Sequence, residues 1–242
     1  MDSMNNKPAS PAKEETARNH AKKPFHIVEA YKTLRTNLLF TLATAERRSV
    51  VLTSAEPHAG KSTTAANLSI VMAQTNFKVL LIDADMRNPS LDRVFRVSRT
   101  NGLSKVLCGM QTAEDAIMKQ VAPNLDLLPS GPIPPNPQEL LCSEEMARLL
   151  KAAEEMYDYI FIDMPPVNLV ADALMLTNET AGVLLVVREG QTTYDELRQA
   201  QEAIQNENIG GRILGTVLTD TRHKNGVYKQ KYYKSSDYRY EQ

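Results

Sequence analysis

The sequence predicts an α/β domain built on a doubly wound, mostly parallel sheet. Apolar runs of strand length alternate with helically periodic segments, which is typical of parallel strands joined by crossover helices. The runs are nearly continuous in apolar residues, as in strands buried on both faces. They cover residues 50–52, 78–83, 125–128, 159–163, 182–187 and 213–218. A chain of 242 residues with 42% hydrophobic content favours one such domain.

Both ends of the chain depart from this pattern. Residues 1–24 are rich in Lys, Glu, Asn, Pro and Ala, and residues 222–242 have no aliphatic side chain beyond Val227. Because neither segment has much apolar area to bury, we expect a disordered leader, a domain over residues 25–221 and a disordered tail. The tail carries a cluster of tyrosines among basic residues: Tyr228, Tyr232, Tyr233, Tyr238 and Tyr240.

The first periodic segment, residues 27–44, predicts an amphipathic helix that docks on the domain. Its apolar side is formed by Ile27, Tyr31, Leu34, Leu38 and Leu42. Its polar side carries Glu29, Lys32 and Arg35. These three residues have two interpretations, a solvated face with a weak Glu29–Lys32 ion pair or a contact between subunits.

Residues 50–64, VVLTSAEPHAGKSTT, read as an apolar strand, a short turn-rich loop and the start of a helix over residues 62–74. This order predicts a phosphate-binding loop, in which backbone N–H groups surround phosphates, a lysine reaches their oxygens and a hydroxyl holds Mg²⁺. Lys61 and Ser62 are the candidates, and Gly60 lets the backbone approach an anion closely. Ala55 stands where the usual motif has its first glycine, so an ordinary capped turn is the alternative. The candidate nucleotide contacts are Ala59, Gly60, Lys61, Ser62 and Thr63.

The remaining connections have weaker signals. Short helical patterns cover residues 103–107, 113–119 and 172–177, and longer ones cover 143–156 and 193–206. The segment Pro129 to Pro137 is too rich in proline for a helix or a central strand, so we expect a fixed loop there.

Carboxylates follow two of the predicted strands. Asp83, Asp85 and Arg87 form D-x-D-x-R directly after one strand, and Asp163 ends another in a D-x-x-P pattern. In an open parallel sheet, ligands bind beyond the carboxyl ends of the strands, where the phosphate loop also falls. We therefore expect Asp163 to serve Mg²⁺, and of the two other acids one to serve the metal and one to orient a hydroxyl nucleophile. An aspartate that merely caps a turn is the alternative.

Composition excludes several classes of protein. The net charge of −1 provides no basic field, which argues against wholesale binding of nucleic acid. Cys108 and Cys142 have no close-spaced partners for a metal site and suit a reducing cytosol. No apolar run approaches the roughly 20 residues of a membrane helix, so any membrane role has to come through a partner.

Five stretches and the tyrosine-rich tail together resemble the bacterial tyrosine kinases of the capsule and exopolysaccharide type, which have the fold of P-loop NTPases. The stretches are EAYKTLRTNL (29–38), SAEPHAGKSTTAANL (54–68), LLIDADMRNP (80–89), LLPSGPIPPNPQELL (127–141) and YDYIFIDMPPV (157–167). The first resembles the family's E-x-x-R-x-x-R ring-forming helix, with Lys32 in place of the first arginine. Lysine keeps the charge but loses the bidentate fork.

The resemblance implies a kinase that uses ATP and Mg²⁺ and phosphorylates its own tail tyrosines between subunits. It places Lys61 and Arg87 on the nucleotide, Ser62, Asp83 and Asp163 on the metal, and Asp85 beside the tyrosine. It also implies a ring of subunits through the N-terminal helix, a transmembrane activator, a cognate tyrosine phosphatase and a cytoplasmic location at the inner face of the membrane. The expected role is control of capsular or exopolysaccharide synthesis and export.

Two other functions remain open. P-loop ATPases of cell division and plasmid partition share the fold, but they carry a lysine five residues before the loop lysine, where this chain has Glu56. A nucleotide-gated scaffold is the second, with a basic, aromatic tail that binds nucleic acid or an anionic membrane. A dinucleotide-binding dehydrogenase is disfavoured because no G-x-G-x-x-G follows any predicted strand.

Overall fold

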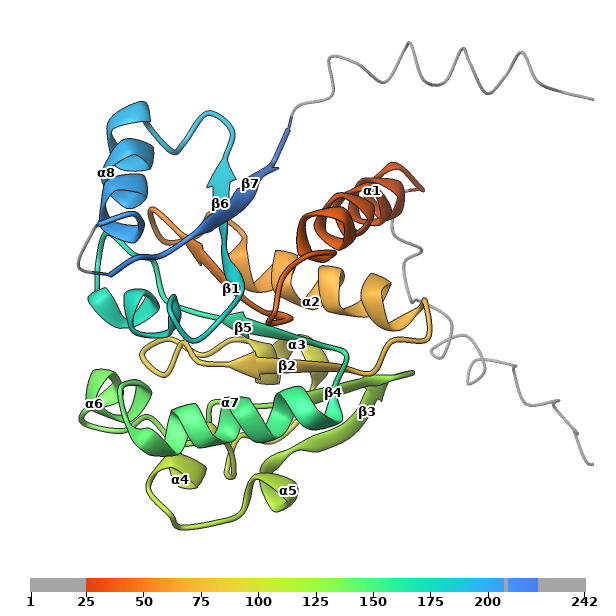
Figure 1. Cartoon of the computed structure of the whole chain (residues 1–242), viewed down its shortest axis with the longest axis vertical. Helices are drawn as coiled ribbons and strands as arrows, with labels where there is room; N and C mark the ends of the chain where they lie inside the picture. Colours follow the sequence, from red (N-terminus) through yellow and green to blue (C-terminus); the bar gives the residue numbers. More distant parts are fainter. Residues whose placement is uncertain (1–24, 207–208, 222–242) are drawn as a thin grey trace, which may run out of the picture.

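The computed structural model describes residues 25–206 and 209–221, so the predicted leader and the tyrosine-rich tail lie outside the described residues. A seven-stranded sheet forms the middle layer, in the order β3-β4-β2-β5-β1-β6-β7. Helices cover both of its faces (Figure 1). The strands are β1 (Ser49–Ser54), β2 (Val79–Asp83), β3 (Met118–Ala122), β4 (Leu125–Leu128), β5 (Tyr159–Asp163), β6 (Gly182–Arg188) and β7 (Ile213–Thr219).

All neighbouring strands are parallel except the pair β3 and β4 at one edge. The predicted doubly wound, mostly parallel sheet is therefore confirmed. Every residue of β1, β2 and β5 is buried, as expected for apolar runs covered by helices on both sides. This order sets β5 between β1 and β2, so the residues that follow these three strands meet at one edge of the sheet.

One face of the sheet is covered by α1 (Phe25–Leu42), α2 (Lys61–Ala73) and α3 (Leu91–Phe95). Leu38 and Leu42 of α1 pack in the same apolar cluster as Leu68 and Met72 of α2, and the two helices lie side by side (Figure 1). The amphipathic period of the first segment thus produces a helix that docks on the phosphate-loop helix.

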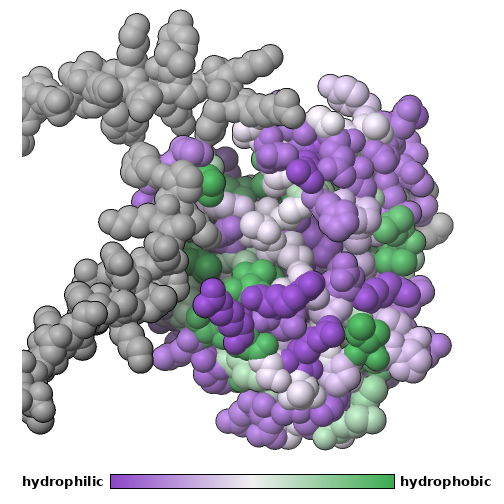
Figure 2. Space-filling model, turned by 180° about the vertical axis from the view of Figure 1, so that it is seen from behind, coloured by the Kyte–Doolittle hydropathy of each residue, from purple (hydrophilic) through white to green (hydrophobic). Residues whose placement is uncertain are grey.

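The opposite face is covered by the remaining helices, which share a second apolar cluster. These are α4 (Leu103–Leu107), α5 (Ala113–Ala116), α6 (Pro137–Leu141), α7 (Glu144–Met156), the 3₁₀ helix η2 (Ala171–Leu176) and α8 (Tyr194–Ile204). Seen from behind, the described surface is mostly hydrophilic, and its hydrophobic side chains gather only in small separate areas (Figure 2).

The predicted secondary structure was wrong in one place and incomplete in others. The pattern over residues 113–119 is helical only to Ala116, and Met118 then begins β3, which runs antiparallel to β4. Two strands separated by two residues form a local hairpin there, and seven residues are too few for the helical period to be distinguished from an edge strand. Residues 172–177 were expected to be helical, and a 3₁₀ helix covers Ala171–Leu176 there, whereas the short helices α3 and α6 were not predicted.

Candidate functional site

The predicted phosphate loop connects β1 to α2 through a sharply turned backbone. His58 and Gly60 both adopt left-handed conformations, with φ of 63° and 91°. Gly60 occupies the N-cap of α2, and no side chain among the residues that the structure describes caps the helix there. The amide groups of the first helical turn therefore point out of the helix without a side-chain partner, which is the arrangement that binds anions.

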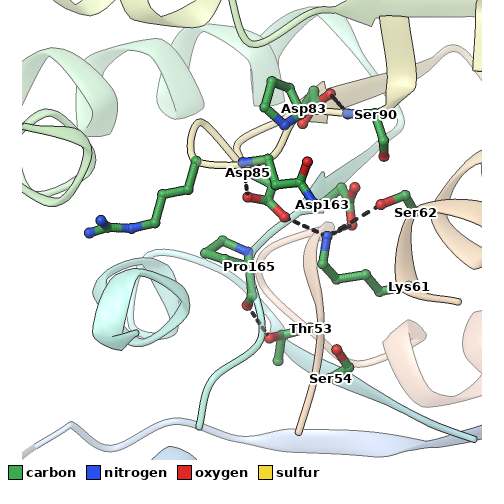
Figure 3. A network of polar contacts seen from close by, with 12 residues as sticks. Thr53, Ser54, Lys61, Ser62, Asp83, Asp85, Ser90, Asp163 and Pro165 are labelled. Carbon is green, nitrogen blue, oxygen red and sulfur yellow. Dashed lines mark hydrogen bonds and ion pairs between the residues drawn. The ribbon is translucent and has the colours of Figure 1, made fainter. Parts of the chain in front are cut away.

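Lys61 lies at the centre of a cluster of polar side chains (Figure 3). Its Nζ atom is 2.8 Å from Asp85 Oδ2, 3.5 Å from Asp163 Oδ1 and 3.3 Å from Ser62 Oγ. The side chains are strongly shielded from water, with exposed fractions of 12% for Lys61, 5% for Asp85 and 0% for Asp163. The predicted residues Lys61, Ser62, Asp85 and Asp163 are thus brought together from three different segments of the chain.

Asp83 completes this cluster from the end of β2. Its Oδ2 atom accepts hydrogen bonds from the backbone amides of Ser90 and Leu91, at 3.1 and 3.0 Å. Its Oδ1 atom is buried and has no hydrogen-bond partner among the residues that the structure describes, and the same holds for Asp163 Oδ2. Two buried carboxylate oxygens are therefore available to a further ligand.

The charges of the cluster do not balance, because three carboxylates surround one ammonium group. Burial, together with the neighbouring charge of Asp163, raises the pKa of Asp83 to about 7. Burial also raises the pKa of Asp163, although Lys61 opposes this shift. Burial alone lowers the pKa of Lys61, but the charges of Asp163, Asp85 and Asp83 outweigh it and the net pKa is raised. An additional cation would relieve the repulsion between these acids.

The donor set fits Mg²⁺. In the described part of the chain, no group of three or more His, Cys, Asp or Glu side chains forms a metal cage. Mg²⁺ does not need one, because it commonly takes one or two carboxylates and completes its shell with water and phosphate oxygens. The unpartnered oxygens of Asp83 and Asp163 and the hydroxyl of Ser62 are donors of the kind that this ion prefers.

Arg87 forms an ion pair with an aspartate of η2. Its Nε and Nη2 atoms donate to the two carboxylate oxygens of Asp172 at 2.8 and 3.1 Å. Asp172 lies in η2 and is 2% exposed, whereas the Arg87 side chain is 43% exposed. The bidentate pair fastens η2 to the D-x-D-x-R segment. No local pattern identified Asp172 as this partner, because the residue lies in a stretch that showed only a short helical period.

A cavity of about 800 Å³ opens beside the loop, between α1, α2 and the end of β7. Its lining includes Tyr31, Leu34, Thr63, Asn67 and Thr219. The volume is within the range of sites for small ligands and cofactors. The sequence did not predict that α1 forms a wall of this cavity, because contacts between segments so far apart leave no local pattern.

The polar side of α1 carries the ion pair expected of a solvated face, together with a contact inside the chain that was not predicted. Lys32 Nζ forms an ion pair with Glu29 Oε1 at 2.8 Å, and both side chains are 44% exposed. Arg35 Nη1 instead donates to the backbone carbonyl of Val71 in α2, at 2.8 Å. Arg35 therefore helps to hold α1 on α2 within one subunit.

Comparison with known proteins shows to which family the chain belongs. A family described as an AAA domain matches residues 50–208. The tyrosine-protein kinase YwqD of Bacillus subtilis is 43% identical over 190 residues, an alignment that covers 78% of this chain and 79% of that protein. The chain belongs to the bacterial tyrosine-protein kinases. The solved kinase domain of the Escherichia coli tyrosine kinase ETK supports this, with 34% identity, a TM-score of 0.75 and coverage of 81% of this kinase and 77% of that chain.

The ATPases considered as an alternative have the same fold but are less similar to this chain. The cell division ATPase MinD of Pyrococcus furiosus matches this kinase with a TM-score of 0.60 and 27% identity, over 71% of each chain. In this kinase Glu56, which replaces the lysine of that group, accepts a hydrogen bond from the hydroxyl of Thr192 in the same chain. Its carboxylate is thus engaged within the subunit.

Proposed function

We propose that this kinase binds ATP with Mg²⁺ at the Lys61 cluster and transfers the γ-phosphoryl group to tyrosine. One observation carries the proposal: the largely shielded Lys61 ammonium lies at the start of α2, in a cluster with two buried carboxylate oxygens that have no hydrogen-bond partner among the described residues. A lysine and free amides suit phosphate oxygens, and the carboxylates suit the metal that accompanies them.

Apart from Asp85, the residues of the loop and the cluster divide into a group that binds phosphate and a group that binds the metal. Lys61 and the backbone of Ala59, Gly60, Ser62 and Thr63 hold the phosphates. The Ser62 hydroxyl and the carboxylates of Asp83 and Asp163 hold Mg²⁺, which when bound neutralises phosphate charge.

Asp85 has a different role in this scheme. It pairs with Lys61 in the nucleotide-free chain, at 2.8 Å. Phosphate oxygens compete for the same ammonium group, which releases the Asp85 carboxylate to accept a hydrogen bond from the tyrosine hydroxyl. Phosphoryl transfer passes through a loose transition state, so the hydroxyl need not be ionised beforehand and Asp85 accepts its proton late.

The proposed acceptors are the tail tyrosines Tyr228, Tyr232, Tyr233, Tyr238 and Tyr240, modified between subunits. Two arguments support this: the resemblance to kinases with such tails, and the charge of the tail, whose lysines and arginines complement the acidic cluster. Asp220 and Thr221, the last residues before the tail, line the cavity beside the phosphate loop. The described chain therefore ends, at Thr221, at the edge of the proposed site.

The proposed setting is control of capsular or exopolysaccharide synthesis and export. We propose a transmembrane activator, a cognate tyrosine phosphatase and a homo-oligomeric ring with Glu29, Lys32 and Arg35 at its interface. A cytoplasmic position at the inner face of the membrane follows from such an activator. Within residues 25–206 and 209–221, no helix has the length and hydropathy needed to cross a bilayer.

The test is phosphate transfer between subunits. Active enzyme truncated after Thr221 is mixed with the full-length Lys61→Met variant, Mg-ATP and the cytoplasmic part of the activator, and mass spectrometry reads the tail. Phosphotyrosine on the inactive partner is the expected result. Steady ATP hydrolysis with an unmodified tail would instead favour an ATPase or scaffold.

A further inference from the structure

The outer edge of the phosphate loop is hydrogen-bonded to the carboxyl ends of β6 and β7. Arg188 Nη1 donates to the backbone carbonyl of His58 at 3.3 Å, and Thr219 Oγ1 donates to the carbonyl of Ala59 at 2.6 Å. Arg188 and Thr219 are partners in the register of the two parallel strands. Two consecutive carbonyl groups of the loop are thus held from one side by a pair of adjacent side chains.

The direction of these carbonyls fixes the direction of two amides. In a trans peptide, the C=O of one residue and the N–H of the next point to opposite sides. The described chain contains no cis peptide. Holding the carbonyls of His58 and Ala59 against β6 and β7 therefore turns the N–H groups of Ala59 and Gly60 to the other side. Neither amide donates a hydrogen bond to any residue that the structure describes.

We propose that Arg188 and Thr219 are positioning residues that aim the amides of Ala59 and Gly60 at the phosphates of the bound nucleotide. This proposal rests on the proposed binding of ATP at the loop. The loop needs such external support because Gly60 has a permissive backbone and His58 holds a left-handed conformation that its Cβ disfavours.

The two positioning side chains are themselves fixed. Asp220 Oδ2 accepts hydrogen bonds from Arg188 Nε at 3.1 Å and from Nη2 at 3.0 Å, which leaves Nη1 for the loop. The side chain of Thr219 lies against Gly60, where an added Cβ would be 3.5 Å from Thr219 Cγ2. Asp220 is thus connected to the loop through the side chain of Arg188.

The test uses the full chain and Mg-ATP, with binding measured by titration of a fluorescent ATP analogue. Thr219→Val keeps the shape of the side chain but removes the hydroxyl, and Thr219→Ser keeps the hydroxyl. Thr216→Val is the matched control, since Thr216 is an exposed residue of the same strand. We expect Thr219→Val to raise the Kd for Mg-ATP about tenfold, while Thr219→Ser and Thr216→Val bind like the wild type.

The kinetic result distinguishes positioning from a merely structural role. The amides bind phosphate in the ground state and in the transition state alike, so Thr219→Val should raise the KM for ATP and leave kcat unchanged. A fall in kcat together with a lower melting temperature would indicate general loosening of the sheet and overturn the proposal. A loss of affinity in Thr219→Ser equal to that in Thr219→Val would also overturn it.

Arg188 supplies an independent variant. Arg188→Met removes the donor to His58 and should weaken Mg-ATP binding in the same direction, whereas Arg198→Met on the exposed side of α8 should not. If the wild type binds Mg-ATP and both Thr219→Val and Arg188→Met bind it with the same affinity, the positioning role is contradicted but the proposed function is not. Absence of Mg-ATP binding in the wild type would instead contradict the proposed function.

Discussion

Asp83 and Asp163 lie directly opposite each other in the register of the neighbouring parallel strands β2 and β5. Each has one carboxylate oxygen that is buried and without a hydrogen-bond partner in the described part of the chain. Because adjacent parallel strands end at one edge of the sheet, two acids at equivalent positions have to share a small space. Without a bound cation, their repulsion opposes folding.

The burial of Asp83, together with this repulsion, predicts how stability depends on pH in the presence of EDTA. The pKa of Asp83 is about 7 in the fold, against an ordinary value of 3.8. The folded chain therefore holds a proton that the unfolded chain releases between these pH values, so the contribution of Asp83 to stability is present below about pH 4 and is lost as the pH rises to about 7. Asp83→Asn keeps an acceptor for Ser90 and Leu91 and should raise the melting temperature at pH 8 by about 4 °C.

The matched control for this variant is Glu155→Gln, since Glu155 is an exposed carboxylate on α7. Melting temperatures are followed by circular dichroism from pH 4 to pH 8. The curve of Asp83→Asn should be flatter than the curves of the wild type and the control. If the melting temperatures of all three proteins change with pH in parallel, Asp83 is not the cause of the loss of stability at high pH.

Lys61→Met should abolish catalysis without unfolding the domain. The variant removes the ammonium group that contacts Asp85 and Asp163. We expect ATP turnover and tail phosphorylation to fall roughly 100-fold or more, and the melting temperature at pH 8 to decrease because buried carboxylates lose their counter-charge. Radiolabelled phosphate incorporation and thermal melting measure the two effects. Incorporation equal to that of the wild type would remove Lys61 from the mechanism.

Local patterns were enough for the fold class and for the centre of the site. Lys61, Ser62, Asp83 and Asp163 were predicted because each lies at the end of a strand or at the start of a helix, where parallel topology brings segments together. The antiparallel strand β3 was missed because its residues carry no clear period.

Partners that depend on tertiary contacts could not be predicted in this way. Asp172 as the partner of Arg87, the carbonyl of Val71 as the partner of Arg35 and the contact of Thr219 with Ala59 all join segments distant in sequence. No spacing rule connects such positions, because the distance between them is set by the packing of whole elements.

Replacing all five clustered tyrosines of the tail with phenylalanine should abolish most autophosphorylation. The described site contains none of these residues, so the affinity for ATP should stay at the wild-type value. Anti-phosphotyrosine blotting and nucleotide titration measure the two properties. Peptide mapping that finds the principal phosphotyrosine outside residues 222–242 would show the acceptor assignment to be wrong.

The charges on α1 predict a change in subunit assembly. Glu29→Ala combined with Arg35→Ala should shift the mass in solution toward the monomer, as measured by light scattering. Since Arg35 also donates to Val71 within the subunit, the double variant tests both contacts at once. Glu29→Ala with Lys32→Ala leaves the Val71 contact intact and isolates the exposed pair. An unchanged mass in both variants would mean that these charges are only solvated.

A variant of Arg87 tests whether this residue contacts the nucleotide or forms only a structural ion pair with Asp172. Two of its guanidinium nitrogens donate to Asp172, which is 2% exposed, so Arg87→Met leaves a buried carboxylate without its partner. We expect a loss of stability of about 1–2 kcal/mol, moderated because Arg87 itself is partly exposed, and no change in the KM for ATP. Adding Asp172→Asn should recover much of this loss, since the uncompensated charge disappears with it. A raised KM for ATP in Arg87→Met, with stability unchanged, would place the guanidinium on the nucleotide instead.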